Sequence, residues 1–303
     1  MTDPHRTSHP TARQRAVAER TAATIGRRRI ANGIMTGVVA LAALITTLPL
    51  LFILFHLVSQ GASALSVDFF TEMPKPVGEG GGMANAIVGT LILIAIACAI
   101  GLPVGIGAGL YLADFRGTRL ATVVRFLADV LNGLPSIVLG VFAWQFLVRP
   151  LGHFSAMSGG VALAAMMIPM VSRTTEEMVR LVPTALREAA LALGYSRART
   201  ALTVVLRTAT AGIVTGVLVA VARIAGETAP LLFTAFGNNF WSIQLNQPIA
   251  ALPLQIFTYA ISPYDEWHRF AWAGALVLIA VVFIISVVAR FVTRSRVAAG
   301  AGD

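Results

Sequence analysis

The stretch Ala209–Phe236 reads ATAGIVTGVLVAVARIAGETAPLLFTAF and carries two charged residues, Arg223 and Glu227, inside an otherwise apolar run. A run of this length can cross a bilayer as a helix. Each ionised side chain at the centre of a membrane helix costs about 2.5–3.5 kcal/mol on insertion scales. The spacing of four residues places both charges on one helical face, where they pair with each other or face a shared cavity.

Two interpretations of this pair remain open at the level of sequence. In the first, Arg223 and Glu227 lie on the path of a polar solute through the membrane, which explains why a costly pair is kept. In the second, they form a self-satisfied ion pair that fixes the orientation of the helix. We favour the first interpretation because of the insertion cost.

Further apolar runs predict an all-α, polytopic membrane protein with six transmembrane helices. Only 12% of the 303 residues are charged, against about 25% in an ordinary soluble domain. The expected spans are 31–58, 85–113, 127–148, 154–172, 209–236 and 269–292. A further apolar piece, 249–260, is too short to span and contains Pro253, so we expect an interfacial or re-entrant segment there.

Basic residues alternate between the two sides of these spans. The tail 1–30 carries seven arginines, the loop 114–126 three and the segment 173–208 six, whereas the opposite loops carry Lys75, Arg149 and Arg269. Loops rich in Lys and Arg stay in the cytoplasm, so we expect a bacterial plasma (inner) membrane protein with both termini cytoplasmic. The orientation of the spans in the membrane is enough to explain these arginine clusters. The net charge of +9 therefore does not indicate a nucleic-acid partner, and we expect the chain to be surrounded by membrane lipids.

Four parts follow from the runs and charges. They are a cytoplasmic basic tail (1–30), a first transmembrane helix with an external loop (31–84), a permease core (85–292) that includes a long inner loop (173–208), and a cytoplasmic C-terminal tail (293–303).

Several kinds of chemistry have no residues to support them in this sequence. Lys75 is the sole lysine and lies in Met-Pro-Lys-Pro, so the chain lacks the Gly-Lys-Ser/Thr loop that holds nucleotide phosphates. Cys98 is the sole cysteine, and the five histidines are scattered without metal-ligand spacing. We therefore expect no catalytic residues, no metal site and no cofactor on this chain. We expect it to be a non-enzymatic subunit, with any ATP and Mg²⁺ bound to a partner ATPase.

The inner loop 173–208 predicts two short helices outside the membrane. Pro183 suits the first turn of a helix, Gly194 a C-terminal cap and Ser196 an N-cap for the next helix. The small side chains of Ala189 and Ala190 would let another protein approach closely. The alternative is an ordinary amphipathic loop lying on the membrane.

In this loop, Glu188-Ala189-Ala190, three residues and then Gly194 resemble the EAA signature of binding-protein-dependent ABC importer permeases. The resemblance implies a type I importer permease (MetI-like) fold, in which Glu188, Ala189, Ala190 and Gly194 belong to the helices that dock on a cytoplasmic ATPase. The usual proline near the end of the signature is replaced by Arg207.

A narrower resemblance, over about residues 80–292, is to phosphate-specific permeases of the PstA type. It is carried by ARIAGETAPLLFTAFGN (222–238), GGMANAIVGTL (81–91), LNGLPSIVLGVFA (131–143) and IAALPLQIFTYA (249–260). It implies that Arg223 and Glu227 line a phosphate pathway. It also implies a homologous permease of the PstC type, an ATPase dimer of the PstB type and an external phosphate-binding protein of the PstS type as partners.

Three further features are assigned from the residues. Ser136 follows Pro135, where a helix has free backbone groups, and is a candidate for the pathway. Arg173, just after the fourth expected span, is a candidate for the inner exit, although the general enrichment of arginine in inner loops also explains it. The glycines at 101, 105, 107 and 109 predict a face for close helix packing, and Asp129 is read as a charge stabilised by a helix N-terminus.

Rival functions stay open at this point. The same class of permease could carry another oxyanion, sulfate or molybdate. An ATP-independent anion channel or carrier is a different class, and a membrane enzyme that uses Arg223 and Glu227 for acid–base chemistry is a third. ATP dependence of uptake and turnover without transport separate these.

Overall fold

The computed structural model describes the backbone of residues 12–299 and the side chains of residues 28–291. The described chain is helical, without an extended strand, and carries two isolated bridges, Pro74 with Gly81 and Phe236 with Ile249. It divides into two compact units, residues 1–56 and 57–303. Residues 1–11 and 300–303 of the two expected tails lie outside the described residues.

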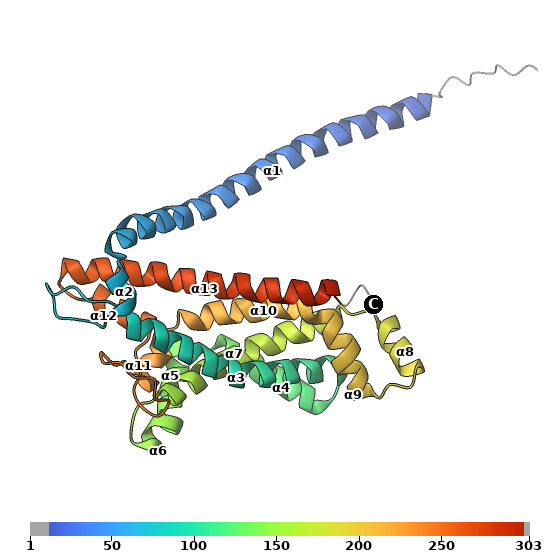
Figure 1. The fold of residues 1–303 in the computed structure, drawn as a ribbon. Coiled ribbons are helices and arrows are strands. Elements are labelled where there is room, and N and C mark those ends of the chain that lie inside the picture. The colour runs from blue at the N-terminus through green and yellow to red at the C-terminus, as the bar shows by residue number, and fades with distance from the viewer. Residues whose placement is uncertain (1–11, 300–303) are drawn as a thin grey trace, which may run out of the picture. The chain divides into compact units, whose positions relative to one another are not determined.

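The first unit consists of most of helix α1 (Ala12–Gly61), and the remaining elements belong to the second (Figure 1). The second unit contains η1 (Ala62–Ala64), α2 (Val67–Thr71), α3 (Ala84–Asp114), α4 (Arg119–Gly133), α5 (Ser136–Ala143), η2 (Trp144–Val148, a π-helical turn), α6 (Arg149–Leu151), α7 (Ala156–Arg180), α8 (Thr184–Ala192), α9 (Arg197–Arg199), η3 (Thr200–Val205, π-helical), α10 (Leu206–Ala225), α11 (Ala229–Thr234), α12 (Leu252–Ala260) and α13 (Asp265–Ala299).

Five described stretches are helices long and apolar enough to cross a membrane: Arg28–Ala64, Ala84–Asp114, Ala156–Arg180, Arg197–Ala225 and Asp265–Phe291. The expected span 127–148 is not a single helix. The chain there forms a pair of helical stretches, Arg119–Gly133 and Ser136–Leu151, bent by 107°, which brings the count to six if the pair is one span. The residue before a proline avoids the helical region, and Leu134 accordingly takes an extended conformation (ψ 138°) ahead of Pro135.

The expected span 209–236 also differs from the structure at both ends. The helix begins earlier, at Arg197, and α10 ends at Ala225, because Gly226 caps it and Glu227 and Thr228 lie in a break before α11. Pro230 in the first turn of α11 has no N–H to continue the ladder from α10. The single apolar run is therefore two helices with a non-helical joint between them.

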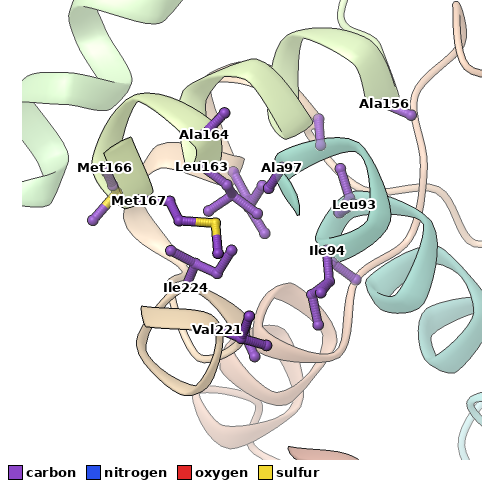
Figure 2. Close-up of a cluster of buried hydrophobic side chains, with 14 of the residues drawn as sticks. Leu93, Ile94, Ala97, Ala156, Leu163, Ala164, Met166, Met167, Val221 and Ile224 are labelled. Carbon is purple, nitrogen blue, oxygen red and sulfur yellow. The ribbon is translucent and has the colours of Figure 1, made fainter. Parts of the chain in front are cut away.

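The core of the second unit lies where α3, α7 and α10 meet. Figure 2 shows Leu93 and Ala97 of α3 facing Leu163 and Met167 of α7, with Ile224 of α10 closing the cluster. All five are almost completely buried. The nine-residue helix α12 is too short to span, and its N-terminal half (Leu252, Pro253, Leu254 and Gln255) and Tyr259 are buried.

Glycines on one face of α3 allow its close approach to α7. A Cβ atom built on Gly105 would lie 2.8 Å from Val171 Cβ, and one on Gly109 would lie 2.5 Å from Thr175 Cβ. The packing face predicted from sequence is thus present at Gly105 and Gly109, whereas Gly107 points into open space.

Replacing Gly109 with Ala is expected to destabilise the protein by about 2 kcal/mol, because the added methyl group overpacks a tight helix contact. Gly107→Ala on the same helix is the matched control, since its methyl group meets no atom within 4 Å and both variants gain the same helix propensity. The thermal unfolding midpoint of the purified protein measures the difference. Equal midpoints for the two variants would contradict the packing argument.

Candidate functional site

Arg223 and Glu227 lie at the joint between α10 and α11. Arg223 is in the last turn of α10, where the negative end of the helix dipole stabilises a cation. Glu227 lies two residues past the end of the helix, and the shortest N–O distance between the two side chains, Arg223 Nε to Glu227 Oε1, is 3.8 Å. The Arg223 side chain is 48% exposed and that of Glu227 is 18% exposed.

This geometry leaves the guanidinium group available. At 3.8 Å, the pair is within ion-pair range but beyond the length of a good charge-assisted hydrogen bond. The other contact of the Arg223 guanidinium is Nη1 at 3.8 Å from Met170 Sδ on α7. Arg223 is thus held loosely, with most of its N–H donors free to bind an oxyanion.

Arg173, the candidate for the inner exit, belongs to a group of five charged residues between α4 and α7. We call it the charge cluster: Arg125, Asp129, Arg173, Glu176 and Arg180. Arg173 donates from Nε to Asp129 Oδ1 (2.9 Å), from Nη2 to Asp129 Oδ2 (2.8 Å) and from Nη1 to Glu176 Oε2 (3.2 Å).

Glu176 is at the centre of the charge cluster. Its side chain is 1% exposed, and it accepts hydrogen bonds from Arg125 Nη2 (2.6 Å), Arg173 and Arg180. A buried carboxylate is tolerated only when it is paired and hydrogen-bonded, which three guanidinium groups achieve here. The three arginines and two carboxylates leave one positive charge in excess.

Sequence reasoning missed most of this cluster. It read Asp129 as a charge at a helix N-terminus, which is wrong, because α4 begins ten residues earlier, at Arg119. Arg125 was counted as one of the loop arginines, yet it reaches Glu176 across 51 residues of sequence. The available signal was the position of Glu176, three residues after Arg173 and four before Arg180, because this spacing places all three side chains on one helical face.

Ser136 is the first residue of α5, directly after the bend at Pro135. It is partly exposed. Its place at the start of a helix leaves its backbone N–H without a helical partner, but no hydrogen bond or ion pair among the described residues joins it to Arg223 or to the charge cluster.

The coupling segment, residues 181–196, forms α8 and a tight turn at one end of the bundle (Figure 1). Pro183 is the N-cap of α8 rather than a residue of its first turn. Gly194 has φ +85°, a left-handed conformation that suits glycine after a helix. Ser196 Oγ accepts a hydrogen bond from Arg199 N at 3.3 Å and so caps the next helix, as the sequence predicts.

The side chains of α8 are not all placed as the EAA pattern suggests. Glu188 and Ala189 are exposed, but Ala190 is 6% exposed and packs within the chain. Leu193, at the tip, is 81% exposed. Glu188, Ala189 and Leu193 are therefore among the exposed residues of α8 and its turn, while the small size of Ala190 serves the chain's own packing.

A family described as binding-protein-dependent transport system inner membrane component matches residues 105–297. The chain belongs to this family. The match covers the charge cluster, the coupling segment and the Arg223 joint. As a member of this inner-membrane family, with five or six candidate spans, the protein is a multi-pass membrane component.

Relatives within the family are similar over nearly their whole length. The phosphate transport system permease protein PstA of Yersinia pestis is 48% identical over 249 residues, 82% of this chain and 84% of that protein. PstA of Xylella fastidiosa (strain Temecula1) is 48% identical over 266 residues, 87% and 93% of the two chains. PstA of Haemophilus influenzae is 44% identical over 264 residues, 87% and 94%.

Solved structures of ABC transporters share the fold of this permease family member. A chain of the inward-facing MetNI methionine ABC transporter aligns with a TM-score of 0.58 and 19% identity over 70% of this chain and 96% of that one. A bacterial ABC transporter involved in the import of the acidic polysaccharide alginate aligns with a TM-score of 0.59 and 12% identity over 91% and 99%. The MetI-like permease fold expected from the sequence is confirmed.

In this permease, one arginine of the coupling segment forms hydrogen bonds to two of the membrane helices. Arg187 of α8 donates from Nη1 to Asp114 Oδ1 of α3 (2.5 Å) and from Nη2 to the Val179 carbonyl of α7 (2.9 Å). A cavity of about 690 Å³ lies beside this contact, between the end of α3, α8 and residues 197–205. Arg187 thus joins α8 to both α3 and α7.

The chain returns towards the membrane helices without a break. Residues Arg197–Ala225 form one continuous helical stretch, which widens into the π-helical turn η3 at 200–205. Arg207, which stands where the signature has proline, lies in the first turn of α10, so its N–H can join the helical ladder. Within the described residues, no group of three His, Cys, Asp or Glu side chains is placed to hold a metal ion.

Proposed function

We propose that this protein is the permease subunit of an ATP-driven importer that moves inorganic phosphate into the cell. The observation that carries the proposal is Arg223, a half-exposed side chain at a helix joint within the family match. Its guanidinium group is 3.8 Å from Glu227 and 3.8 Å from Met170, which leaves donors for an anion. A guanidinium fork matches the geometry of a phosphate oxyanion, and exclusion of water strengthens the contact. The PstA relatives support phosphate as the solute.

The joint at 226–228 gives Glu227 a role in this proposal. When the path is empty, the Glu227 carboxylate balances the charge of Arg223 from 3.8 Å. When phosphate arrives, it competes for the same guanidinium group, and the loose pair separates at little cost. Ser136, at the bend between α4 and α5, is proposed as a further polar group of the path.

The partners of the proposed complex are a homologous permease of the PstC type, an ATPase dimer of the PstB type and an external phosphate-binding protein of the PstS type. ATP and Mg²⁺ bind to the ATPases, and this chain is non-catalytic. The ATPases dock on Glu188, Ala189 and Leu193 of the coupling segment, with Ala190 and Gly194 shaping α8 and its turn. Both termini and the coupling segment are cytoplasmic, as the arginine distribution indicates.

Uptake of radiolabelled phosphate into proteoliposomes that contain the whole complex tests this function. We expect uptake that requires ATP inside the vesicle and the external binding protein, and that excess sulfate or molybdate does not inhibit. Uptake without ATP would indicate a channel or carrier, and inhibition by sulfate or molybdate would indicate another oxyanion as the solute. Either result overturns the proposal.

Replacing Leu193 with Asp is expected to weaken ATPase docking by about 30-fold, because about 2 kcal/mol of apolar burial is lost and a charge enters the interface. Leu193 is the most exposed large apolar side chain of α8 and its turn. The readout is the amount of ATPase that co-purifies with the tagged permease. Leu245→Asp, an exposed leucine in the loop at the opposite end, is the matched control. Equal ATPase recovery from both variants would contradict docking on Leu193.

A further inference from the structure

The two carboxylates of the charge cluster differ in how firmly they are held. The Glu176 side chain is 1% exposed and shared by three arginines, whereas that of Asp129 is 50% exposed and bound to Arg173 alone. The side chains of the three arginines are 26–38% exposed. Their hydrogen bonds to described residues leave some N–H donors of each guanidinium group unused. An incoming anion can therefore displace Asp129 but not Glu176.

The charge cluster is continuous with the Arg223 joint along α7. Arg223 lies against Met170, and Arg173 follows Met170 by three residues, about 4.5 Å along the helix on the same side. Arg180 lies seven residues further, about 10.5 Å towards the coupling segment. Guanidinium groups thus recur along α7 from the Arg223 joint to the end that carries α8.

We propose that the charge cluster is a second anion site, which receives the phosphate group from Arg223 before its release into the cytoplasm. The anion takes the place of the Asp129 carboxylate on the Arg173 fork. Glu176 is a positioning residue that holds Arg125 and Arg180 beside it. This inference rests on the proposed function and adds an exit site to it.

The chemistry of the site fits a tetrahedral oxyanion. Asp129 presents two oxygens to Nε and Nη2 of Arg173, and two phosphate oxygens have the geometry to make the same bidentate contact. Unlike Asp129, phosphate also offers oxygens to Arg125 and Arg180, which keep N–H donors that no described carboxylate takes. The excess positive charge favours an anion, and the competition from Asp129 keeps the binding weak enough for release.

Asp129→Asn in the assembled complex tests the exit site. The measurement is equilibrium binding of radiolabelled phosphate to the complex in phosphatidylcholine nanodiscs, without the external binding protein and in an Arg223→Gln background that removes the first site. We expect the affinity to rise about fivefold, because the competing carboxylate of an exposed ion pair is gone. Adding Arg173→Gln to Asp129→Asn is expected to abolish this gain.

Glu177→Gln is the matched control. Glu177 neighbours Glu176, is exposed, and forms no ion pair with any described residue, so its loss changes the net charge equally without freeing an arginine. Thermal unfolding separates binding from a purely structural role of Asp129. If the role is structural only, the unfolding midpoint of Asp129→Asn differs from that of the wild type in the absence of phosphate. Adding phosphate then raises both midpoints by the same amount. If Asp129→Asn and Glu177→Gln bind phosphate equally, the exit site is overturned.

Two further outcomes separate this inference from others. A wild-type complex that imports no phosphate overturns the proposed function, whereas import combined with equal affinities in the two variants overturns the exit site alone. A lipid headgroup offers the same phosphate chemistry. The test for a headgroup adds phosphatidylglycerol to the nanodisc. If this lipid abolishes the binding of inorganic phosphate and stabilises Asp129→Asn more than Glu177→Gln, the site binds a lipid headgroup. That result would overturn the assignment of the site to the transported anion.

Discussion

Phosphate uptake is expected to fall at least about 30-fold when Arg223 is replaced by Gln, while the complex still assembles and hydrolyses ATP. Loss of one partner from a charged hydrogen bond shielded from water costs about 2–5 kcal/mol, and 2 kcal/mol corresponds to about 30-fold. The half-exposed guanidinium, 3.8 Å from Glu227, contributes little to folding. The measurement is radiolabelled phosphate uptake in cells, with membrane abundance of the protein checked in parallel.

Two variants control this experiment. Arg149→Gln removes an exposed arginine that contacts only Gln145 among the described side chains, and it is expected to leave uptake unchanged. Arg223→Lys keeps the charge but loses the planar fork, so uptake should fall between wild type and Arg223→Gln. Normal uptake in Arg223→Gln would show that Arg223 and Glu227 are a structural ion bridge and that no solute contacts them.

Glu176→Gln is expected to destabilise the protein by about 3 kcal/mol and to lower the amount of assembled complex. The substitution keeps the size of the side chain but removes the one buried carboxylate that three guanidinium groups share, and breaking a buried ion pair on one side carries a cost of this order. The thermal unfolding midpoint and the yield of complex after purification report the loss.

Asp129→Asn and Glu177→Gln are the controls for the loss of stability in Glu176→Gln. Asp129 is half exposed, so its loss should cost less than about 1 kcal/mol. Glu177→Gln should have no measurable effect on stability. If Glu176→Gln unfolds at the same temperature as Glu177→Gln, the buried carboxylate does not hold α4 to α7 as the hydrogen bonds indicate.

Sequence reasoning was most successful where one physical rule acts over a long stretch. Apolar length identified the helices at 84–114, 156–180 and 265–291, because a bilayer demands that length of any spanning helix. Local rules also predicted the close contacts at Gly105 and Gly109 and the cap at Ser196. Glycines spaced along a membrane helix allow close helix packing, and a serine hydroxyl before a helix accepts a hydrogen bond from its first turn.

The predicted helix boundaries were wrong where the sequence stays apolar across a break in a helix. Pro135 and Gly226 interrupt helices inside runs that remain hydrophobic, and a count of apolar residues does not register such breaks. The charge cluster was missed for a different reason. Arg125 and Glu176 are far apart in sequence, and the positive-inside rule already accounted for each arginine taken alone. Only the packing of α4 on α7 brings the two together.

The continuous helix from Arg197 to Ala225 determines how far along its axis Arg223 lies and in which direction its side chain points. Arg223 lies 26 positions after Arg197, which is about 39 Å if every step had the α-helical rise, and each α-helical residue turns the helix by about 100°. One residue inserted in α10 would advance Arg223 by about 1.5 Å and rotate it away from Met170. A whole inserted turn would restore the direction of the side chain but shift it by about 5.4 Å. Insertions and deletions in this stretch are therefore disfavoured, even where the individual apolar side chains are interchangeable.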